Sequence, residues 1–256
     1  MDLSGKAAMV TGASHGIGRA IASEMAKAGA NVATNCLHED DDSHETEEML
    51  RVTGHHMLVC YGDVTDYHKL ESNVAAIVEN FGRLDIAVAN AAFSVLEPFC
   101  SADLNAFRRT VDVTMWGTFY LFRVAANQMI RQSSGGALLA VGSPHAFIPA
   151  PGAMAYNMAK AAVDQLARTA AVELADHRIR VNILYPGWTD TPGERRFNNE
   201  EQIAASSQHL LWKRLARPEE IARAAVFLCD PANDYISGSS LIVDGAQSHA
   251  HSWPTN

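Results

Sequence analysis

Short runs of apolar residues alternate with longer amphipathic stretches along the whole chain. The short runs are bounded by glycine and polar residues, as buried strands are, whereas the longer stretches repeat apolar residues at the spacing of one helix face. Apolar strands that are separated by helices are typical of a parallel sheet covered on both faces. We predict strands at Ala7–Val10, Asn31–Cys36, His56–Cys60, Ile86–Ala89, Ala137–Val141, Val181–Leu184 and Leu241–Val243.

The amphipathic stretches between these runs predict the helices. They are Gly16–Ala28, Glu45–Arg51, Tyr67–Phe81, Leu104–Gln132, Tyr156–Leu174 and Pro218–Leu228. Because neither a linker-like change in composition nor an internal repeat is visible, we expect one doubly wound α/β domain of the Rossmann type over residues 1–256. Its sheet should be seven-stranded and mostly parallel, with helices on both faces.

The segment from about 188 to 212 is expected to be irregular. It follows the sixth predicted strand and the sequence YPGWTDTPGERRF, whose prolines and glycines oppose regular structure. Ligands of open α/β sheets bind beyond the carboxyl ends of the strands. We therefore predict that this segment is a lid over the substrate.

Composition and charge exclude several classes of protein. The 256 residues are 48% hydrophobic and 19% charged, which is typical of a globular protein and not of a disordered chain. The net charge is −9, and no stripe of lysine and arginine is present that could neutralise phosphates, so a nucleic-acid partner is not expected. We interpret the acidic run at 39–42 as the solvated start of a helix.

Neither a membrane nor a metal is expected as a partner. No apolar segment approaches the length of a membrane span, and the first strand follows directly on the N-terminus, so we expect a cytoplasmic protein. His249 and His251 are interpreted as tail residues and not as metal ligands. The cysteines form no CxxC pair, and we interpret them as small buried or half-buried thiols and not as disulfides or metal ligands; they are Cys36, Cys60, Cys100 and Cys229.

A glycine-rich motif, TGASHGIG at 11–18, lies between the first predicted strand and the first predicted helix. Gly12 permits a tight turn, Gly16 lets the backbone approach a phosphate, and Gly18 allows helix and strand to pack closely. The free N–H groups of the helix N-terminus attract a pyrophosphate. In this position the motif predicts a dinucleotide-binding turn.

Tyr156 and Lys160, in the sequence YNMAK, lie four residues apart on one face of a predicted helix. Tyrosine and lysine at this spacing are common, so the pair alone is explained by packing as well as by chemistry. The rest of the sequence decides between the two.

The motifs TGASHGIG, NAA at 90–92, Ser143, YNMAK and PGWTDT at 186–191 occur in an order and spacing that resemble the short-chain dehydrogenase/reductase family. The resemblance extends over essentially the whole chain, to SGSSLIVDGA near the end. It implies an NAD(P)-dependent oxidoreductase that interconverts a secondary alcohol, or a sugar hemiacetal, and a carbonyl by hydride transfer. It also implies that Tyr156 moves the proton, that Ser143 holds the substrate oxygen and that Lys160 binds the nicotinamide ribose.

The chemistry of these side chains agrees with the roles that the resemblance implies. A tyrosine has a pKa of about 10, which is too high for a base near neutral pH. The Lys160 ammonium and an oxidised nicotinamide would stabilise the phenolate. The family usually has an asparagine where this chain has Thr114, and we expect its hydroxyl to bind a water in a modified proton relay. The expected catalytic residues are therefore Ser143, Tyr156, Lys160 and Thr114.

The cofactor preference depends on the end of the second strand. Strict NAD dependence normally requires a carboxylate there, and this chain has Cys36 instead. His15 and His38, supported by Asn35, are the cations available for a 2′-phosphate, so we expect NADP to be favoured and NAD to be usable. Asp63 resembles the aspartate of the family that contacts adenine, and a helix N-cap is its alternative. The expected cofactor contacts are Gly12, Ser14, His15, Gly16, Ile17, Gly18, Asn35, Cys36, His38, Asp63, Val64, Asn90, Ala91, Ala92, Tyr156, Lys160, Pro186, Gly187, Thr189 and Thr191.

Polar residues expected around the substrate favour a sugar or polyol. The expected substrate contacts are Ser143, His145, Tyr156, Trp188 and Glu194. The alternative is a 3-oxoacyl-carrier-protein-type ketoreductase, for which the pair at 195–196 is the one candidate basic docking patch. A non-catalytic dinucleotide-binding protein is a further alternative. The threonine in the relay position favours it, and the intact Ser143, Tyr156 and Lys160 oppose it.

The predicted helices Leu104–Gln132 and Tyr156–Leu174 are apolar around more of their circumference than one sheet face can bury. Such helices need a second partner, and small alanines allow close approach between helices. The family resemblance implies dimers or tetramers built on the same helices. We expect a homotetramer, with a dimer as the second choice.

Overall fold

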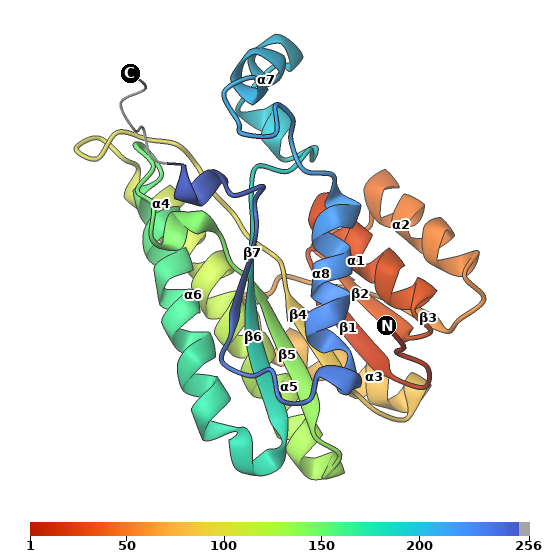
Figure 1. Ribbon diagram of the computed structural model, residues 1–256. Coiled ribbons are helices and arrows are strands. Elements are labelled where there is room, and N and C mark those ends of the chain that lie inside the picture. Colours follow the sequence, from red (N-terminus) through yellow and green to blue (C-terminus); the bar gives the residue numbers. More distant parts are fainter. Residues whose placement is uncertain (251–256) are drawn as a thin grey trace.

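The computed structural model describes residues 1–250, and its centre is one seven-stranded sheet in the order β3-β2-β1-β4-β5-β6-β7 (Figure 1). Every neighbouring pair of strands is parallel. The predicted fold class is confirmed, and each predicted strand is present with ends that differ by one or two residues at most. The strands are β1 (Ala7–Thr11), β2 (Asn31–Cys36), β3 (Met57–Tyr61), β4 (Ile86–Ala89), β5 (Gly136–Val141), β6 (Ile179–Pro186) and β7 (Ser240–Val243).

Helices cover both faces of the sheet (Figure 1). One face carries α1 (Gly16–Lys27), α2 (Asp41–Arg51) and α8 (Pro218–Cys229). The other carries α3 (Tyr67–Phe81), α5 (Gly117–Gln132) and α6 (Met154–Glu173). The shorter helices α4 (Leu104–Val111) and α7 (Glu200–Ser207) lie toward the end of the molecule at which the strands finish. Within residues 1–250, no helix combines the length and the apolar character that crossing a membrane requires.

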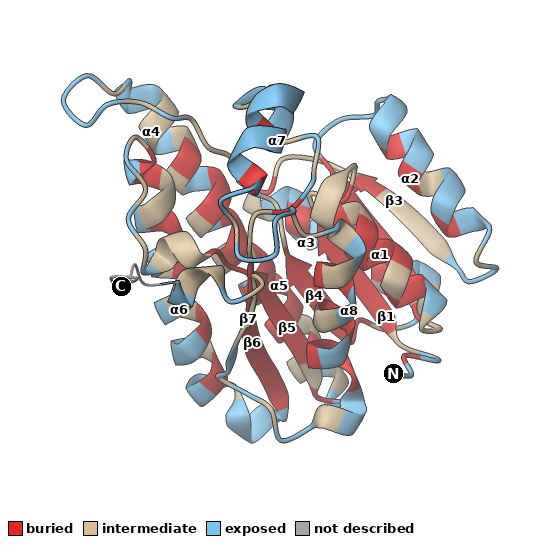
Figure 2. Ribbon diagram, turned by 45° about the horizontal axis from the view of Figure 1, so that its top comes forward, coloured by how far each residue is buried: buried red, intermediate tan, exposed pale blue. Residues whose placement is uncertain are grey.

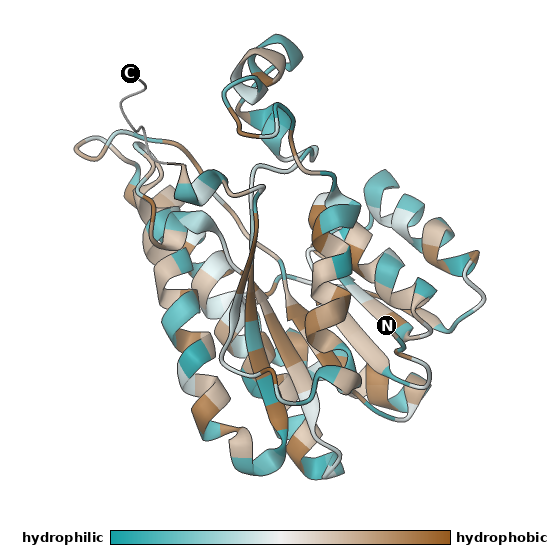
Figure 3. Cartoon of the chain, in the orientation of Figure 1, coloured by the Kyte–Doolittle hydropathy of each residue, from teal (hydrophilic) through white to brown (hydrophobic). Residues whose placement is uncertain are grey.

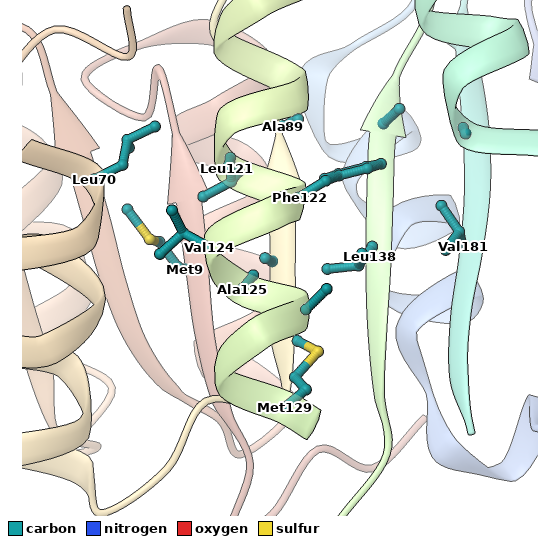
Figure 4. Packing of buried hydrophobic residues seen from close by; sticks show 14 of the residues in the cluster. Met9, Leu70, Ala89, Leu121, Phe122, Val124, Ala125, Met129, Leu138 and Val181 are labelled. Carbon is teal, nitrogen blue, oxygen red and sulfur yellow. The ribbon is translucent and has the colours of Figure 1, made fainter. Parts of the chain in front are cut away.

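Two apolar clusters, one on each face, hold the helices to the sheet. On one face, α5 lays Leu121, Val124 and Met129 against the strands, among them Met9 of β1 and Leu138 of β5 (Figure 4). The five inner strands are almost fully buried and the edge strands β3 and β7 are partly exposed, whereas the outer helix surfaces are exposed and polar (Figures 2 and 3). Because each fully buried side chain of this size contributes about 1.5–3 kcal/mol, the sheet is a rigid platform for the loops at its carboxyl edge.

The predicted helix Leu104–Gln132 is not continuous, and this expectation is corrected. A π-helical turn at Asp112–Trp116 separates α4 from α5, and it contains Thr114. A π-turn inserts one residue into the helical pattern, so the apolar periodicity on either side continues and conceals it.

The acidic run at 39–42 starts a helix, as predicted, but α2 begins earlier than the expected Glu45. The Asp40 side chain accepts the Ser43 N–H at 2.8 Å, and the Asp40 N–H donates to Ser43 Oγ at 3.0 Å. This reciprocal capping box satisfies the first turn of the helix. The carboxylates at the start of α2 are therefore held in place beside α1.

The expected irregular region after β6 contains regular structure. Asn199 caps α7 in a second capping box with Gln202, so a helix of eight residues forms where we expected none. Its polar sequence gave no apolar period that would have revealed it. Helix α7 stands above the carboxyl ends of the strands, which is the position expected of the lid (Figure 1).

Candidate active site

The turn between β1 and α1 is shaped by its glycines. Gly12 and Gly16 have φ angles of +62° and +58°, in the left-handed region that favours glycine. A Cβ atom on Gly18 would lie 2.2 Å from the Gly12 carbonyl oxygen, so only glycine fits there. A Cβ on Gly16 would lie 3.2 Å from Thr191, which places the loop after β6 directly over the turn.

The first turn of α1 is prepared for an anion. His15 is the N-cap residue in an extended conformation, and its side chain forms no capping hydrogen bond. The N–H groups at the start of this helix thus lack the side-chain acceptor that usually satisfies them, and the positive end of the helix dipole points outward. These features fit the pyrophosphate of a dinucleotide.

The segment after β4 closes the other side of the glycine turn. Asn90 Nδ2 donates to the carbonyl oxygens of Thr11 at 3.0 Å and Gly12 at 2.9 Å. The Thr11 hydroxyl in turn accepts the N–H groups of Asn90 and Ala91. Asn90 therefore holds the shape of the turn, and Ala91 packs 2.8 Å from where a Cβ on Gly12 would be.

The structure brings together three of the four residues expected to be catalytic, Ser143, Tyr156 and Lys160. Ser143 follows β5 and is buried, and its Oγ accepts the His145 N–H at 3.2 Å. Tyr156 and Lys160 occupy successive turns at the start of α6. Lys160 is also buried, donates from Nζ to the Val141 carbonyl oxygen at 2.6 Å, and lies 5.4 Å from the centre of the Tyr156 ring.

Burial dominates the protonation of this pair. It raises the pKa of Tyr156 to about 12, with the Ser143 hydroxyl opposing the rise and the negative charge of Glu194 adding to it. Burial lowers the pKa of Lys160 to about 8. In the protein alone, the tyrosine is thus held protonated. The expected lowering of its pKa requires added positive charge, which Lys160 can supply from its position beside the ring.

Thr114 is placed near these residues but has a specific partner. Its hydroxyl donates to the Phe93 carbonyl oxygen, and its oxygen accepts the Phe93 N–H, both at 3.2 Å. The residue is fully buried. The hydroxyl proton is therefore already used, and a relay water could bind Thr114 only by donating to the remaining lone pair of Oγ1.

The residues expected at the adenosine end are close together, but their side chains differ in how free they are to contact a cofactor. Cys36 is buried, and burial raises the pKa of its thiol to about 11, so it is neutral. Asn35 donates from Nδ2 to the Gly62 carbonyl oxygen at 3.1 Å and so braces the strand ends. His38 is exposed, while burial lowers the pKa of His15.

Asp63 has an ion-pair partner that the sequence did not reveal. Arg109 of α4 donates to Asp63 Oδ2 at 2.6 Å, and Thr65 donates to Oδ1. Burial alone would raise the pKa of Asp63, but these hydrogen bonds outweigh it and hold the pKa below its usual value. The N-cap of α3 is Asp66, so the alternative role of Asp63 as that cap is wrong.

The residues expected to contact substrate line the same end of the sheet. Trp188 follows β6, and its Nε1 donates to Glu194 Oε2 at 2.7 Å. His145 meets the Tyr156 ring edge to face at 6.2 Å, and its Nδ1 lies 3.3 Å from the Ile148 carbonyl oxygen. A proton on Nδ1 would leave the other ring nitrogen as an acceptor. The Glu194 carboxylate, held by Trp188, acts electrostatically on Tyr156 and raises its pKa.

The remaining expected cofactor contacts lie around the glycine turn or at the ends of β3 and β6. Val64 packs against Gly117, where a Cβ would lie 2.6 Å from it, and Thr189 donates to the Gly187 carbonyl oxygen. The Ser14 carbonyl oxygen accepts hydrogen bonds from Arg19. The others are Ile17 in α1, Ala92 after β4, and Pro186 and Gly187 at the end of β6.

The residues 1–250 contain no His, Cys, Asp and Glu group that could hold a metal ion, and His251 lies outside the described residues.

The sequence model of the family described as Enoyl-(Acyl carrier protein) reductase matches residues 12–246. L-rhamnose 1-dehydrogenase (NAD(P)(+)) of Sphingomonas sp. is 34% identical, over 95% of this chain and 96% of that protein. Glucose 1-dehydrogenase 2 of Bacillus subtilis is 33% identical, over 95% of each chain. A further relative is 3beta-hydroxysteroid dehydrogenase 1 of Eggerthella lenta, 32% identical over 95% of this chain and 94% of that protein.

Solved structures agree with the sequence relatives. A putative short-chain alcohol dehydrogenase from Sinorhizobium meliloti superposes with a TM-score of 0.92 at 32% identity, over 98% of this chain and 99% of that one. The chain belongs to the short-chain dehydrogenase/reductase family, as its motifs indicated. It is an NAD(P)-dependent oxidoreductase that acts on CH–OH groups.

Proposed function

We propose that the protein oxidises a sugar or polyol, or reduces the corresponding carbonyl compound, at Tyr156. The observation that supports this substrate most strongly is the Glu194 carboxylate, whose negative charge raises the pKa of Tyr156. Trp188 Nε1 holds this carboxylate at 2.7 Å, and no cation in residues 1–250 forms an ion pair with it. A negative charge opposes formation of the phenolate, so its presence has a cost for proton abstraction. Hydrogen bonds that substrate hydroxyl groups donate to this carboxylate would offset this cost.

The roles of the residues follow from their geometry. Bound NAD(P) supplies the hydride acceptor or donor. Ser143 donates to the substrate oxygen and stabilises the charge that develops on it. Tyr156 exchanges the hydroxyl proton, and Lys160 stabilises the phenolate from beside the ring. Asn90, Gly12 and Gly18 fix the turn that orients the dinucleotide, with the start of α1 facing its pyrophosphate.

A steroid or an acyl-carrier substrate fits the described residues less well. The half-buried Glu194 carboxylate is a poor neighbour for an apolar ring system, since a bound steroid would remove its hydration without supplying a partner. The basic patch considered for an acyl carrier is partly neutralised. Arg195 is paired with Asp190 at 2.7 Å and with Glu200 at 2.5 Å, which leaves Arg196 as the unpaired member in residues 1–250.

A substrate panel tests the proposed substrate class. Neutral aldoses and polyols, a hydroxysteroid and a 3-oxoacyl thioester are compared with NAD and NADP by the absorbance of the reduced nicotinamide. We expect the highest kcat/KM for a sugar or polyol. Glu194→Gln should raise KM for that substrate by about tenfold, since a hydrogen bond to a charged group contributes about 1.5–3 kcal/mol. The matched control is Glu201→Gln in the first turn of α7, which should leave KM unchanged.

Either of two results would contradict the sugar assignment. One is a preferred steroid or thioester in the panel. The other is a Glu194→Gln enzyme that keeps the KM of the parent for the preferred sugar. In both cases the oxidoreductase activity itself would stand, and only the substrate class would change.

For the cofactor, we propose that both dinucleotides are used and that NADP is favoured. The missing carboxylate at Cys36 supports use of NADP, since no charge there repels a 2′-phosphate. The name of the rhamnose-oxidising relative includes both dinucleotides, which supports dual use. Comparison of kcat/KM for NAD and NADP with one substrate gives the preference directly.

For the assembly, we propose a homotetramer, with a dimer as the second choice. An apolar groove of about 660 Å³ runs between α5 and α6, and its lining includes Phe119, Ile130, Ala162, Leu166 and Ala170. A second copy of these helices across a two-fold axis would fill it, as small residues allow close approach. Light scattering at micromolar concentration would test this proposal. A mass near the 27.7 kDa of one chain would contradict it.

The lid and the location are further proposals. We propose that residues 188–212 close over the bound substrate, which is supported by the position of Thr191 over Gly16 and of α7 beyond the strand ends. Proteolysis of this segment should slow when the dinucleotide and substrate are bound.

The cytoplasmic location expected from the sequence stays a prediction, which cell fractionation would check.

A further inference from the structure

Arg19 in the second turn of α1 joins the glycine turn to α2. Its Nε and Nη2 donate to the Ser14 carbonyl oxygen at 2.9 and 2.5 Å, and Nε also donates to Thr46 Oγ1 at 2.8 Å. Thr46 is itself buried and bonds to the same carbonyl oxygen. The guanidinium is therefore fixed beside the dinucleotide-binding turn, on the side that faces the end of β2.

Two carboxylates of α2 occupy the outer edge of this guanidinium. Glu45 Oε2 lies 2.5 Å from Arg19 Nη1, and Asp42 Oδ1 lies 3.3 Å from Nη2. The Arg19 side chain is only 15% exposed, whereas the two acidic side chains are 52% and 61% exposed. The arginine is thus held by the protein, and its charge is neutralised from the solvent side.

This ion-pair cluster lies next to the place where the adenosine ribose must bind. In the fold, that ribose sits between the glycine turn and the end of the second strand, and an arginine nearby can accommodate a 2′-phosphate. Arg19 acts electrostatically on both His15 in the turn and Cys36 at the end of β2. Asp42 and Asp40 act on His15 as well, and Asp40 also acts on Cys36. The charge near the 2′ position therefore depends on Arg19 and Asp42, and on Glu45 through its 2.5 Å ion pair with Arg19.

We propose that Glu45, assisted by Asp42, is a determinant of cofactor specificity that limits affinity for NADP by neutralising Arg19. A 2′-phosphate carries nearly two negative charges, so each carboxylate nearby weakens its binding, while the 2′-hydroxyl of NAD is nearly indifferent to them. Cys36 therefore allows NADP to bind, and Glu45 lowers the affinity for NADP. This inference rests on the dinucleotide being the cofactor and is independent of the substrate.

The chain offers a matched control for removing this one charge. Glu48 lies on the same helix and pairs with Arg51 at 2.7 Å, with 68% of its side chain exposed to solvent. Glu45→Gln and Glu48→Gln change the net charge equally, but only the first frees Arg19 Nη1. Arg196 of the lid, the other cation that acts on His15, is unchanged in both variants.

The experiment measures dissociation constants of NADH and NADPH by the fluorescence of the reduced nicotinamide. In Glu45→Gln, the affinity for NADPH should rise roughly five- to tenfold and that for NADH should change less than about twofold. Glu48→Gln should leave the ratio of the two constants within about twofold of the parent. An increase of ionic strength should reduce the gain in Glu45→Gln, because the effect is electrostatic.

Several results would overturn the proposal. They are an unchanged ratio in Glu45→Gln, an equal shift in Glu48→Gln, and an equal gain for NADH and NADPH. If Glu45→Gln does not fold, as judged by its melting temperature, Asp42→Asn takes its place and should shift the ratio in the same direction. Binding of neither dinucleotide by the parent protein would instead contradict its assignment as an NAD(P)-dependent enzyme.

Discussion

Lys160 Nζ lies 5.4 Å from the centre of the Tyr156 ring and donates its one identified hydrogen bond within residues 1–250 to the Val141 carbonyl oxygen. No carboxylate forms an ion pair with it in the same residues. The ammonium is therefore buried without an opposite charge, and its electrostatic effect is directed at the tyrosine. A buried charge without a partner lowers the stability of the folded protein, but here it can stabilise the Tyr156 phenolate during catalysis.

The cost should be visible in the dependence of stability on pH. Burial lowers the pKa of Lys160 to about 8 from its usual 10.5, so the folded protein binds fewer protons than the unfolded chain between those values. The free energy of unfolding contributed by this group thus rises as the pH rises from about 8 to about 10. Above that, Tyr156, whose pKa is raised to about 12, contributes in the opposite direction.

Lys160→Met isolates this effect. The parent minus variant difference in the free energy of unfolding, measured in urea without cofactor, should change by on the order of 2 kcal/mol over that pH interval, in favour of the parent at high pH. A difference that is independent of pH would show that Lys160 is not held with a lowered pKa.

The hydrogen bonds of Thr114 predict different effects for two substitutions at this position. An asparagine amide can accept the Phe93 N–H and donate to its carbonyl oxygen, as the threonine hydroxyl does. Thr114→Asn should therefore fold and stay active. Thr114→Val keeps the shape but leaves both Phe93 groups unpaired, which should cost about 1–3 kcal/mol in urea unfolding. Equal stability of Thr114→Val and the parent would contradict this role of the hydroxyl.

The groove between α5 and α6 predicts where a charge will separate the subunits. Ala162 lines the groove, while its neighbour Ala161 is exposed outside it. Ala162→Glu should reduce the mass seen by light scattering to that of a smaller assembly, because a buried charge without a partner is costly at an interface. Ala161→Glu is the control and should leave the mass unchanged. An intact assembly in Ala162→Glu would place the interface elsewhere.

The fold could be predicted almost completely, because buried strands must be apolar and parallel strands need helices between them. The π-turn at Asp112–Trp116 could not, since an extra residue in a helix leaves the apolar pattern readable on both sides. Helix α7 was missed for a different reason. It is short and polar, and its capping box at Asn199 and Gln202 was the one local signal.

The candidate site was predictable where backbone geometry dictates the residue type. Gly12 and Gly16 need positive φ, so their positions reveal the turn directly. Arg19 and Arg109 were not identified, because their roles depend on carboxylates 23 and 46 residues distant in the sequence, Asp42 and Asp63. Only the three-dimensional structure brings such partners together.

Replacement of Tyr156 by phenylalanine tests most directly whether this site performs proton transfer. The change removes the hydroxyl and keeps the ring beside Lys160 and His145. With the preferred substrate of the panel, we expect kcat to fall by at least about a hundredfold, while the dissociation constant of the dinucleotide stays within about twofold of the parent. A variant that retains more than about a tenth of the parent kcat would contradict the assignment of Tyr156 as the general acid and base.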